Sequence, residues 1–272
     1  MTTMSKSKGT ALVTGASTGI GAIYAERLAN RGYDLILVAR NQARLTELAN
    51  RLAAQSGRTV KTLAADLGNK SDLARVEATL RDDASITLLI NNAGVGAVTP
   101  LIATDVGKMD DLISLNVTAL TRLTYAAAPQ FVSRGSGTII NIASVVGIAP
   151  EMLNGVYGAS KAYVLAFSQS LQHELADKGI RVQAVLPGAT ATDFWEIAGH
   201  HHRNLPQEIV MSAQDMVDAA LAGLDQGEVV TIPSLADQNE WTSYEAARRA
   251  MSTHLSSATP AARYKVSERA IA

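Results

Sequence analysis

Short apolar runs alternate with longer amphipathic stretches along most of this chain. Most of the runs are continuously apolar, which is typical of strands buried on both faces of a parallel sheet. The alternation therefore predicts an α/β fold: a doubly wound sheet of about seven mainly parallel strands flanked by helices. The predicted strands span residues 10–14, 34–39, 59–64, 86–91, 137–143, 181–187 and 228–233, and the predicted helices span roughly 19–31, 41–56, 70–82, 106–133, 155–178 and 213–226.

The composition fits a globular protein with a large core. Of the 272 residues, 47% are hydrophobic, which is too many for a disordered chain. No linker, repeat or low-complexity tract interrupts the alternation, so we expect a single domain over residues 1–272. After Pro233 the sequence turns helical and polar, and we expect residues 234–272 to form a C-terminal tail.

Several classes of function are excluded by charge and residue usage. The net charge is −1 and the charged residues are scattered, so no basic stripe indicates nucleic acid. The absence of cysteine excludes disulfides, thiolate chemistry and cysteine zinc sites. The polar N-terminus lacks a signal-peptide pattern, and no apolar run reaches the roughly 18 residues of a membrane span. We expect a cytoplasmic protein without nucleic-acid or membrane partners.

Three adjacent histidines do not indicate a metal site. His200, His201 and His202 are consecutive, so on any regular element their side chains point in different directions. Metal ligands usually need a spacing such as i and i+4, and no carboxylate or cysteine pattern completes a site here. We therefore predict a loop and no metal.

A glycine-rich turn follows the first predicted strand. The segment TGASTGIG at residues 14–21 leads directly into a helix-like stretch. Missing side chains in such a turn allow a tight bend and a close approach of backbone to phosphate, and the helix N-terminus adds free N–H groups. The spacing G-x3-G-x-G is a variant of the dinucleotide fingerprint, although a purely structural turn is the alternative. The predicted cofactor-binding residues here are Gly15, Ser17, Thr18, Gly19, Ile20 and Gly21.

The end of the second predicted strand indicates which dinucleotide binds. There the sequence reads LILVARN, with Arg40 and no carboxylate. An acidic residue at this place bonds a ribose 2′-OH, whereas an arginine accommodates a 2′-phosphate. We therefore predict NADP(H) in preference to NAD(H), the alternative being that Arg40 is a solvated residue beside a helix cap at Asn41. Asp66 and Leu67, after the third strand, are expected to bond and flank the adenine.

Ser144, Tyr157 and Lys161 form the candidate catalytic group. Tyr157 and Lys161 are four residues apart, so a helix would place them on one face. An ammonium beside a phenol favours the phenolate and lowers a pKa that is otherwise about 10. Tyr157 is then a proton donor and acceptor for a substrate oxygen, and Ser144 can supply a second hydrogen bond. A YxxxK pair alone is weak evidence, because most such pairs are not catalytic.

With these features the chain resembles the short-chain dehydrogenase/reductase family, over roughly residues 8–195. The resemblance implies a Rossmann-type fold and an oxidoreductase acting on a CH–OH group. The family's motifs occur in its order and at its spacing: TGASTGIG, Asp66, NNAG at 91–94, Asn116, Ser144, YxxxK and PG at 187–188.

The resemblance also implies roles for individual residues. Tyr157 would be the general acid in reduction and the general base in oxidation. Lys161 would lower the pKa of Tyr157 and hold the nicotinamide ribose, and Ser144 would orient and polarise the carbonyl. Asn116 would kink its helix or tether a water linked to Lys161. The remaining implied cofactor residues are Asn92, Ala93 and Gly94 on the adenosine side, and Pro187, Gly188, Thr190 and Thr192 around the carboxamide.

The segment 190–212 is the candidate substrate lid, following a cofactor part at about 8–190. It leaves the sixth strand at the carboxyl edge of the sheet, where doubly wound folds bind ligands. Its apolar side chains could cap an apolar pocket or pack on the core, and Gly199 and Pro206 could bound the mobile part. The candidate pocket residues are Phe194, Trp195 and Ile197 in this segment, with Val95, Gly96, Met152 and Leu153 facing them.

The favoured function is NADP(H)-dependent interconversion of a carbonyl (ketone or aldehyde) and an alcohol, on a small and apolar substrate. A reductase of 3-oxoacyl-carrier intermediates is one alternative, for which Arg203 with Arg134 would be a thin docking patch. A dinucleotide-binding sensor without catalysis is another, although the intact tetrad speaks against it. Family resemblance suggests a homodimer or homotetramer built on the helices at 106–133 and 155–178.

Overall fold

The structure, a computed structural model, describes residues 7–199 and 201–264. These residues fall into two compact units, of which the first extends to Pro233 and the second begins at Ser234. The second unit consists of helix α9 (Gln238–Ala250) and short 3-10 turns at Met251–His254 and Ala262–Tyr264. A helix with short turns lacks the separate hydrophobic core that defines a domain. The assignment of residues 1–272 to a single domain stays a prediction.

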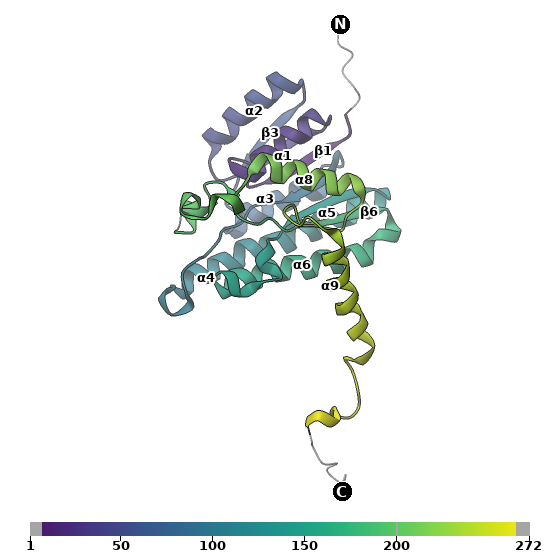
Figure 1. Cartoon of the computed structure of the whole chain (residues 1–272). Helices are drawn as coiled ribbons and strands as arrows, with labels where there is room; N and C mark the ends of the chain where they lie inside the picture. The colour runs from purple at the N-terminus through teal and green to yellow at the C-terminus, as the bar shows by residue number, and fades with distance from the viewer. Residues whose placement is uncertain (1–6, 200, 265–272) are drawn as a thin grey trace. The chain divides into compact units, whose positions relative to one another are not determined.

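The first unit is built on a parallel seven-stranded sheet, as the alternation predicted (Figure 1). The strand order is β3-β2-β1-β4-β5-β6-β9, so the direction of winding reverses between β1 and β4. A crevice at the carboxyl ends of the strands, beside this reversal, is where doubly wound folds bind ligands. The strands are β1 (Thr10–Thr14), β2 (Asp34–Ala39), β3 (Val60–Ala64), β4 (Ile86–Asn91), β5 (Gly137–Ile142), β6 (Ile180–Val185) and β9 (Val230–Thr231).

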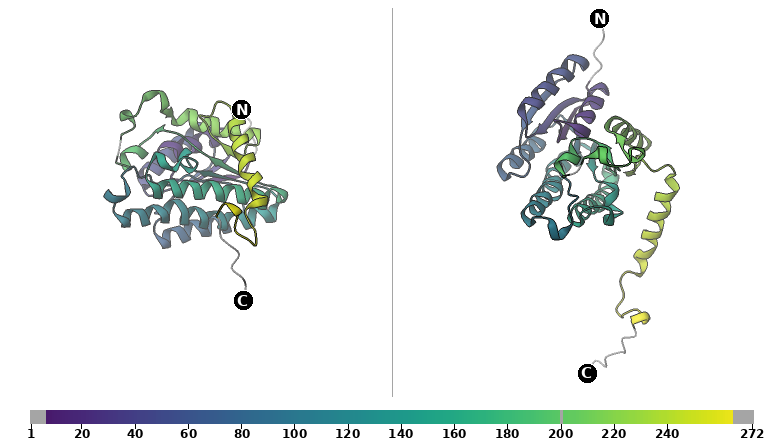
Figure 2. Two further views of the ribbon diagram at one scale, coloured as in Figure 1. Left: turned by 60° about the horizontal axis from the view of Figure 1, so that its bottom comes forward. Right: turned by 60° about the vertical axis from the view of Figure 1, so that its left-hand side comes forward.

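Helices cover both faces of the sheet and make it a three-layer fold (Figure 2). One apolar cluster joins the sheet to α1, α2 and α8, and a second joins it to α3, α5 and α6. The strands in the middle of the sheet are therefore buried on both sides, which explains their continuous apolar sequences, whereas the edge strand β3 is partly exposed. The helices are α1 (Gly19–Asn30), α2 (Gln42–Ser56), α8 (Ala213–Gln226), α3 (Lys70–Asp82), α5 (Leu120–Arg134) and α6 (Gly155–Leu175).

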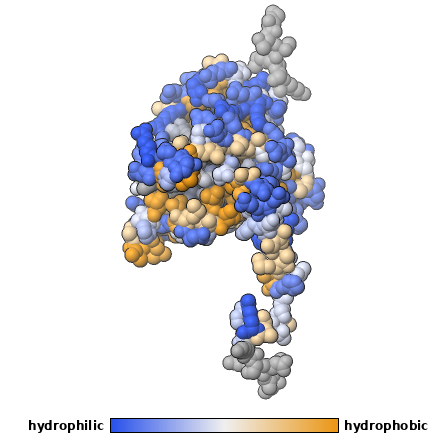
Figure 3. All heavy atoms as spheres, viewed as in Figure 1, coloured by the Kyte–Doolittle hydropathy of each residue, from blue (hydrophilic) through white to orange (hydrophobic). Residues whose placement is uncertain are grey.

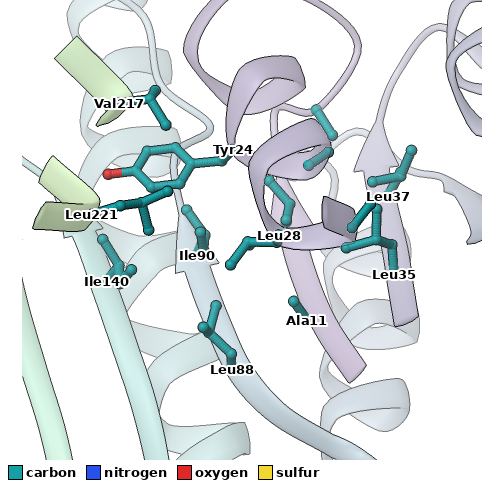
Figure 4. Packing of buried hydrophobic residues seen from close by; sticks show 14 of the residues in the cluster. Ala11, Tyr24, Leu28, Leu35, Leu37, Leu88, Ile90, Ile140, Val217 and Leu221 are labelled. Carbon is teal, nitrogen blue, oxygen red and sulfur yellow. The ribbon is translucent and has the colours of Figure 1, made fainter. Parts of the chain in front are cut away.

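Tyr24 anchors α1, which follows the glycine turn, against the sheet and α8. Its ring lies between Val217 and Leu221 of α8 and the strand residues Ile90 and Ile140 (Figure 4). Burying a ring of this size contributes on the order of 2 kcal/mol. The hydroxyl has no hydrogen-bond partner among the described residues, and burial raises the pKa of Tyr24 well above its usual value.

A buried polar chain ties the helices on the second face to the strands in the middle of the sheet. Asn91 of β4 donates through Nδ2 to Thr124 Oγ1 of α5 at 3.1 Å and to Asn141 Oδ1 of β5 at 2.9 Å. Asn141 in turn donates to Ser168 Oγ of α6 at 2.9 Å. Because these groups are shielded from water, breaking one bond would leave a buried polar atom unpaired. This series of buried hydrogen bonds thereby fixes the position of α6, the helix that carries Tyr157.

The helix predicted over 106–133 is interrupted. The structure has α4 (Val106–Ile113), a π-helical turn (Ser114–Ala119) and then α5. Asn116 lies in the π turn, and π turns occur often at functional sites. The local sequence LISLNVTAL has a continuous helical pattern, so the interruption follows from tertiary contacts of Asn116 and not from a breaking residue.

The segment 190–212 is closed at its base by a second small sheet. Strands β7 (Thr190–Ala191) and β8 (Met211–Ser212) pair in parallel, a pairing that the sequence did not predict. Between them lies the short helix α7 (Phe194–Ile197). The β7–β8 pairing therefore holds the two ends of the candidate lid together.

An exposed apolar segment lies immediately before α4 (Val106–Ile113) in the sequence and includes the first residue of that helix. Leu101, Ile102 and Val106 are among the most exposed large hydrophobic residues of the protein. Figure 3 shows apolar side chains gathered at the lower left, where Figure 1 places this segment. Along the described ranges, no helix combines the length and the apolar character needed to cross a bilayer.

Candidate active site

The glycine turn has the geometry that a phosphate-binding turn requires. Gly15 and Gly19 adopt φ values of 65° and 54°, a region that residues with a Cβ rarely enter. Gly21 lies in α1 with ordinary helical backbone, but a Cβ there would lie 2.3 Å from Gly15 O and 2.6 Å from Asn92 Nδ2. Gly21 is thus required for space, and Gly15 and Gly19 for conformation.

Thr14 and Asn92 hold this turn in place. Thr14 Oγ1 accepts the backbone N–H groups of Asn92 and Ala93, each at 3.0 Å. Asn92 Nδ2 donates to Thr14 O at 2.9 Å and to Gly15 O at 3.2 Å. The NNAG segment therefore braces the turn from the end of β4, and the Asn92 amide is already engaged with protein carbonyls.

The N-terminus of α1 offers its amides to a ligand. Asn41, Asn69 and Asn154 cap α2, α3 and α6 with their side chains, whereas Thr18 makes no side-chain cap for α1. Uncapped amides at a helix N-terminus, with the favourable dipole, suit an anion such as a pyrophosphate. A Cβ at Gly19 would lie 3.2 Å from Thr192 Cγ2, so the segment after β6 reaches this turn. Ser17, Thr18 and Ile20 are partly exposed around it.

Arg40 stands at the carboxyl end of β2, next to this turn, with its side chain exposed. None of the hydrogen bonds or ion pairs of the described residues engages its guanidinium, so the group is available for a ligand. Asn41 caps α2 by accepting from Arg44 N at 3.0 Å. After the end of β3, Asp66 is exposed and accepts a hydrogen bond from Gly68 N at 3.0 Å. Leu67 is buried in the second core cluster, which leaves little of its side chain to flank an adenine.

Ser144 and Tyr157 meet at the carboxyl ends of β5 and β6. Ser144 Oγ donates to Pro187 O at 3.3 Å and accepts from Val146 N at 3.4 Å, and both bonds are long. Asn154 caps α6 and accepts from Tyr157 N at 3.3 Å, which fixes where Tyr157 leaves the helix. Burial raises the pKa of Tyr157 to about 12, and the neighbouring Ser144 hydroxyl acts in the opposite direction.

The raised pKa of Tyr157 is opposite to the lowered pKa that the tyrosine–lysine pair alone predicts. Removing a phenol from water disfavours its charged form, and that effect is the largest here. Lys161 Nζ lies 5.8 Å from the Tyr157 ring centroid and donates to Ile142 O at 2.9 Å. Tyr157 therefore keeps its proton at neutral pH in this geometry.

Lys161 is itself buried, and burial lowers its pKa to about 8. A Cβ at Gly94 would lie 3.7 Å from Lys161 Nζ and 3.0 Å from Asn116 Oδ1, so Gly94 leaves room where these groups approach each other. At neutral pH the Lys161 ammonium is largely protonated, and it can donate to a ligand hydroxyl as well as to Ile142 O.

Asn116 ties the loop after β4 to α6. Its Oδ1 accepts from Val95 N at 2.9 Å, and its Nδ2 donates to Val95 O at 2.9 Å and to Ser160 Oγ at 3.2 Å. Within the part of the chain that the structure describes, no hydrogen bond joins Asn116 to Lys161. The side chain is thus a brace for the site, and it accounts for the π turn.

The PG segment at 187–188, which leads into the lid, contacts the segment after β5 that carries Ser144. Pro187 O accepts from Val145 N at 3.0 Å as well as from Ser144. Thr190 Oγ1 donates to Gly188 O at 3.2 Å, and Trp195 Nε1 donates to Thr190 O at 2.9 Å. Thr190 and Trp195 are both buried, so they hold the base of the lid.

Some of the predicted pocket residues pack around Tyr157. Val95, Leu153 and Phe194 pack with Tyr157 in one cluster. Met152 is 61% exposed and does not join it. The side chain of Ile197 lies outside the described part of the structure.

The candidate docking patch for an acyl carrier is not formed. Arg134 donates to Ala84 O at 3.0 Å and to Ile86 O at 2.9 Å, and Ile86 begins β4. Arg134 therefore lies at the amino edge of the sheet, whereas Arg203 follows the carboxyl edge. The thin support that Arg203 with Arg134 offered for such a patch is therefore lost, because a helix running back to the next strand ends at the opposite edge of the sheet.

The histidine segment forms local contacts. His201 Nε2 lies 3.2 Å from Glu196 Oε1, and His201 Nδ1 accepts from Arg203 N at 3.1 Å. Among the described residues no group of three His, Cys, Asp or Glu side chains could hold a metal ion. His200 lies outside the described residues.

Sequence reasoning missed three residues that support the site: Thr14, Asn154 and Ser160. Ser160 Oγ donates to Tyr157 O at 2.7 Å and accepts from Asn116. Asn154 also donates to Thr99 O at 2.6 Å, which links α6 to the loop after β4. A cap signal was present at Asn154, three residues before Tyr157. The contacts of Thr14 and Ser160 join distant segments and leave no local signal.

The buried ammonium should be visible in the pH dependence of stability. The folded-state pKa of Lys161, about 8, lies below the unfolded value of about 10.4. Between these values the unfolded chain carries a proton that the folded chain lacks, so stability rises with pH. We expect the free energy of unfolding to increase by about 2 kcal/mol more from pH 8 to pH 10 in the wild type than in Lys161→Met. Denaturant titration at both pH values measures this, and equal changes in the two proteins would contradict it.

Comparison with known sequences gives a family match and relatives of the same kind. Residues 9–203 match the family model described as short chain dehydrogenase. An uncharacterized oxidoreductase of Staphylococcus epidermidis is 34% identical over 233 residues, which is 85% of this chain and 95% of the relative. The very-long-chain 3-oxoacyl-CoA reductase of Anas platyrhynchos is 36% identical over 193 residues, which is 69% of this chain and 62% of the relative.

Two solved structures are more similar still. A short-chain dehydrogenase from Sphingobium yanoikuyae in complex with NADPH is 50% identical, with a TM-score of 0.92, over 94% of this chain and 99% of that one. The bulky-bulky ketone specific alcohol dehydrogenase from Comamonas testosteroni is 46% identical, with a TM-score of 0.88, over 95% of this chain and 99% of that one.

Proposed function

Because this chain belongs to the short-chain dehydrogenase family, we propose that it interconverts a carbonyl and an alcohol with NADP(H), using Tyr157 as the general acid and base. The observation that carries the proposal is that Lys161 Nζ lies 5.8 Å from the Tyr157 ring centroid and donates to Ile142 O at the end of β5, two residues before Ser144, at the carboxyl edge of the sheet. A glycine turn suited to pyrophosphate lies at the same edge. The family's enzymes are oxidoreductases, which agrees with the prediction from sequence.

The side chains fit reduction of a carbonyl in the following way. Bound NADPH would supply a hydride to the carbonyl carbon. A carbonyl oxygen within about 2.6–3.2 Å of Tyr157 Oη would take the phenolic proton, which a pKa of about 12 keeps in place at neutral pH. The Ser144 hydroxyl, held only by long bonds, would turn to donate to the same oxygen. Lys161 would hold the ribose hydroxyls and place its positive charge near the forming phenolate.

In the reverse direction Tyr157 would have to accept the alcohol proton as a phenolate. Burial opposes that state, so oxidation should gain more than reduction from raising the pH. At neutral pH the phenol is therefore in the protonated form that carbonyl reduction uses.

The substrate that we propose is an apolar ketone or aldehyde. Val95, Leu153 and Phe194 form an apolar wall beside Tyr157. The alcohol dehydrogenase of Comamonas testosteroni, 46% identical, is described as specific for bulky-bulky ketones, which supports a ketone as the substrate class; the size of each substituent is a separate question. The relatives that reduce very-long-chain 3-oxoacyl-CoA keep the acyl-carrier alternative open, but Arg134 gives it no support. A non-catalytic sensor would have no need for the Ser144–Tyr157–Lys161 arrangement.

The test is a spectrophotometric assay of NADPH oxidation with a panel of ketones and aldehydes, together with fluorescence titration of NADPH and NADH. Turnover of at least one apolar carbonyl with tight NADPH binding is the expected result. NADPH binding without turnover across the panel would favour the sensor. Binding of neither dinucleotide would overturn the proposal.

Arg40 should set the preference for the phosphorylated cofactor. We expect Arg40→Asp to weaken NADPH binding at least tenfold relative to NADH, because the fork of charge-assisted bonds to the 2′-phosphate is lost and a repelling charge replaces it. The measurement is the ratio of the two dissociation constants by fluorescence titration.

Arg44→Asp is the matched control for this change. It makes the same alteration of charge four residues away on exposed α2, so general electrostatics would affect both variants alike. An unchanged NADPH/NADH ratio in Arg40→Asp, or an equal shift in the control, would remove Arg40 from the 2′-phosphate site.

Assembly and location stay predictions. A homodimer or homotetramer built on α5 and α6 is supported by an outward aromatic stack. Phe167 lies with its ring centroid 6.4 Å from that of Tyr125 and 5.6 Å from that of Tyr163, and Tyr125 is 69% exposed. A cytoplasmic location is likewise expected from the sequence alone.

A further inference from the structure

The ring of Phe194 occupies the space that a side chain at position 96 would fill. A Cβ at Gly96 would lie 2.1 Å from Phe194 Cζ and 2.8 Å from both Cε atoms. Gly96 is not among the glycines with positive φ, so its backbone does not require glycine. The missing side chain therefore makes room for one ring, which comes from a segment about a hundred residues away.

The same ring faces the catalytic tyrosine. The centroids of Phe194 and Tyr157 are 5.9 Å apart, with their planes tilted by 46°. Phe194 is only half-buried, although it packs with Val95, Leu153 and Tyr157. It thus lies between Gly96, in the loop after β4, and the ring of Tyr157, where it would meet one substituent of a carbonyl bonded to Tyr157.

The base of the lid holds the ring in this place. Trp195 meets Phe194 edge-on, with centroids 5.8 Å apart and planes at 89°, and Trp195 Nε1 donates to Thr190 O. Thr190 belongs to β7, which pairs with β8. The position of the ring is therefore set by a fixed base, and the ring itself can turn away without breaking a hydrogen bond.

From these contacts we infer that Phe194, seated on Gly96, is the residue that limits the size of the second substituent on the carbonyl substrate. This inference rests on the proposed function and deepens it. On this inference, a substituent as small as methyl would be accepted with the ring in place. A bulkier group needs the ring to leave Gly96, which gives up the apolar contacts of the ring with Gly96 and Tyr157.

The first experiment compares two apolar ketones that share one bulky group, with methyl or a second bulky group on the other side. We expect Phe194→Ala to raise the ratio of kcat/KM for the bulky-bulky ketone over the methyl ketone at least tenfold, and Phe194→Leu to raise it less. Met152→Ala is the control, because Met152 is exposed and outside the cluster around Tyr157; its ratio should stay at the wild-type value. NADPH binding, measured in parallel, establishes that each variant is folded.

The second experiment asks whether Gly96 acts through the ring. An alanine at position 96 cannot coexist with the seated ring, so Gly96→Ala should change the ratio at least threefold in the wild type. In the Phe194→Ala background the same change should leave the ratio within twofold, because the ring that it displaces is gone. Such non-additivity is the signature of two residues in direct contact.

The outcomes separate the inference from the proposed function. If wild-type protein turned over none of the carbonyls, the proposed function would be wrong and the inference with it. If it turned over both ketones but Phe194→Ala kept the wild-type ratio, only the inference would be overturned. The same holds if Gly96→Ala had equal effects in both backgrounds, since Gly96 would then act without the ring.

Discussion

Replacing Tyr157 with phenylalanine should lower kcat for carbonyl reduction about a thousandfold and leave NADPH binding within about threefold of the wild type. The variant keeps the ring, its burial and its packing against Phe194, and removes only the hydroxyl that delivers the proton. General acid catalysis typically contributes 10²–10⁴-fold, which sets the size of the loss. Steady-state kinetics on any active ketone and fluorescence titration with NADPH measure the two quantities.

Tyr163→Phe is the control for this prediction. Tyr163 lies on the same helix, α6, and its hydroxyl is 2.8 Å from Thr121 Oγ1, away from Ser144. Removing it should leave kcat within about twofold, because the hydroxyl is part-exposed and outside the reacting group. Near wild-type turnover by Tyr157→Phe would show that another group transfers the proton and would end the mechanism proposed for this site.

Gly21→Ala should weaken NADPH binding at least a hundredfold. The added methyl would lie 2.3 Å from Gly15 O and 2.6 Å from Asn92 Nδ2, so the turn must shift away from α1 and its amides. The same crowding should lower the free energy of unfolding by about 1–3 kcal/mol. Fluorescence titration and denaturant unfolding separate the loss of binding from the loss of stability.

Gly155→Ala is a matched change in a place without neighbours. Gly155 begins α6, has no positive φ, and a Cβ there would meet nothing within 4 Å. Alanine should therefore leave binding unchanged and raise stability by up to about 1 kcal/mol, through the smaller entropy of the unfolded chain. If Gly21→Ala bound NADPH as well as Gly155→Ala does, the turn would not be the pyrophosphate site.

The sequence by itself determined the layers of the fold and the residues that gather at its edge. Continuous apolar strands and amphipathic helices are local patterns, and their alternation admits a doubly wound parallel sheet with few alternatives. Once that topology is given, residues that follow strand ends, such as Gly15, Arg40 and Ser144, must meet at the carboxyl edge. The helical spacing of Tyr157 and Lys161 likewise follows from position alone.

Only the tertiary structure decided how these residues are held and charged. The π turn at Asn116 comes from bonds to Val95 and Ser160, and the brace of the glycine turn comes from Thr14 and Asn92. Arg134 proved to lie at the far edge.

The charge states of the catalytic residues depended on the tertiary structure as well. The pKa of Tyr157 is raised and not lowered, because burial of the phenol is the largest influence on it and only Ser144 acts in the opposite direction. A pattern of neighbours along the chain records which side chains face the core. Burial, however, is the sum of contacts from segments far apart in sequence, such as Phe194 on Gly96, and these exist only after the chain has folded.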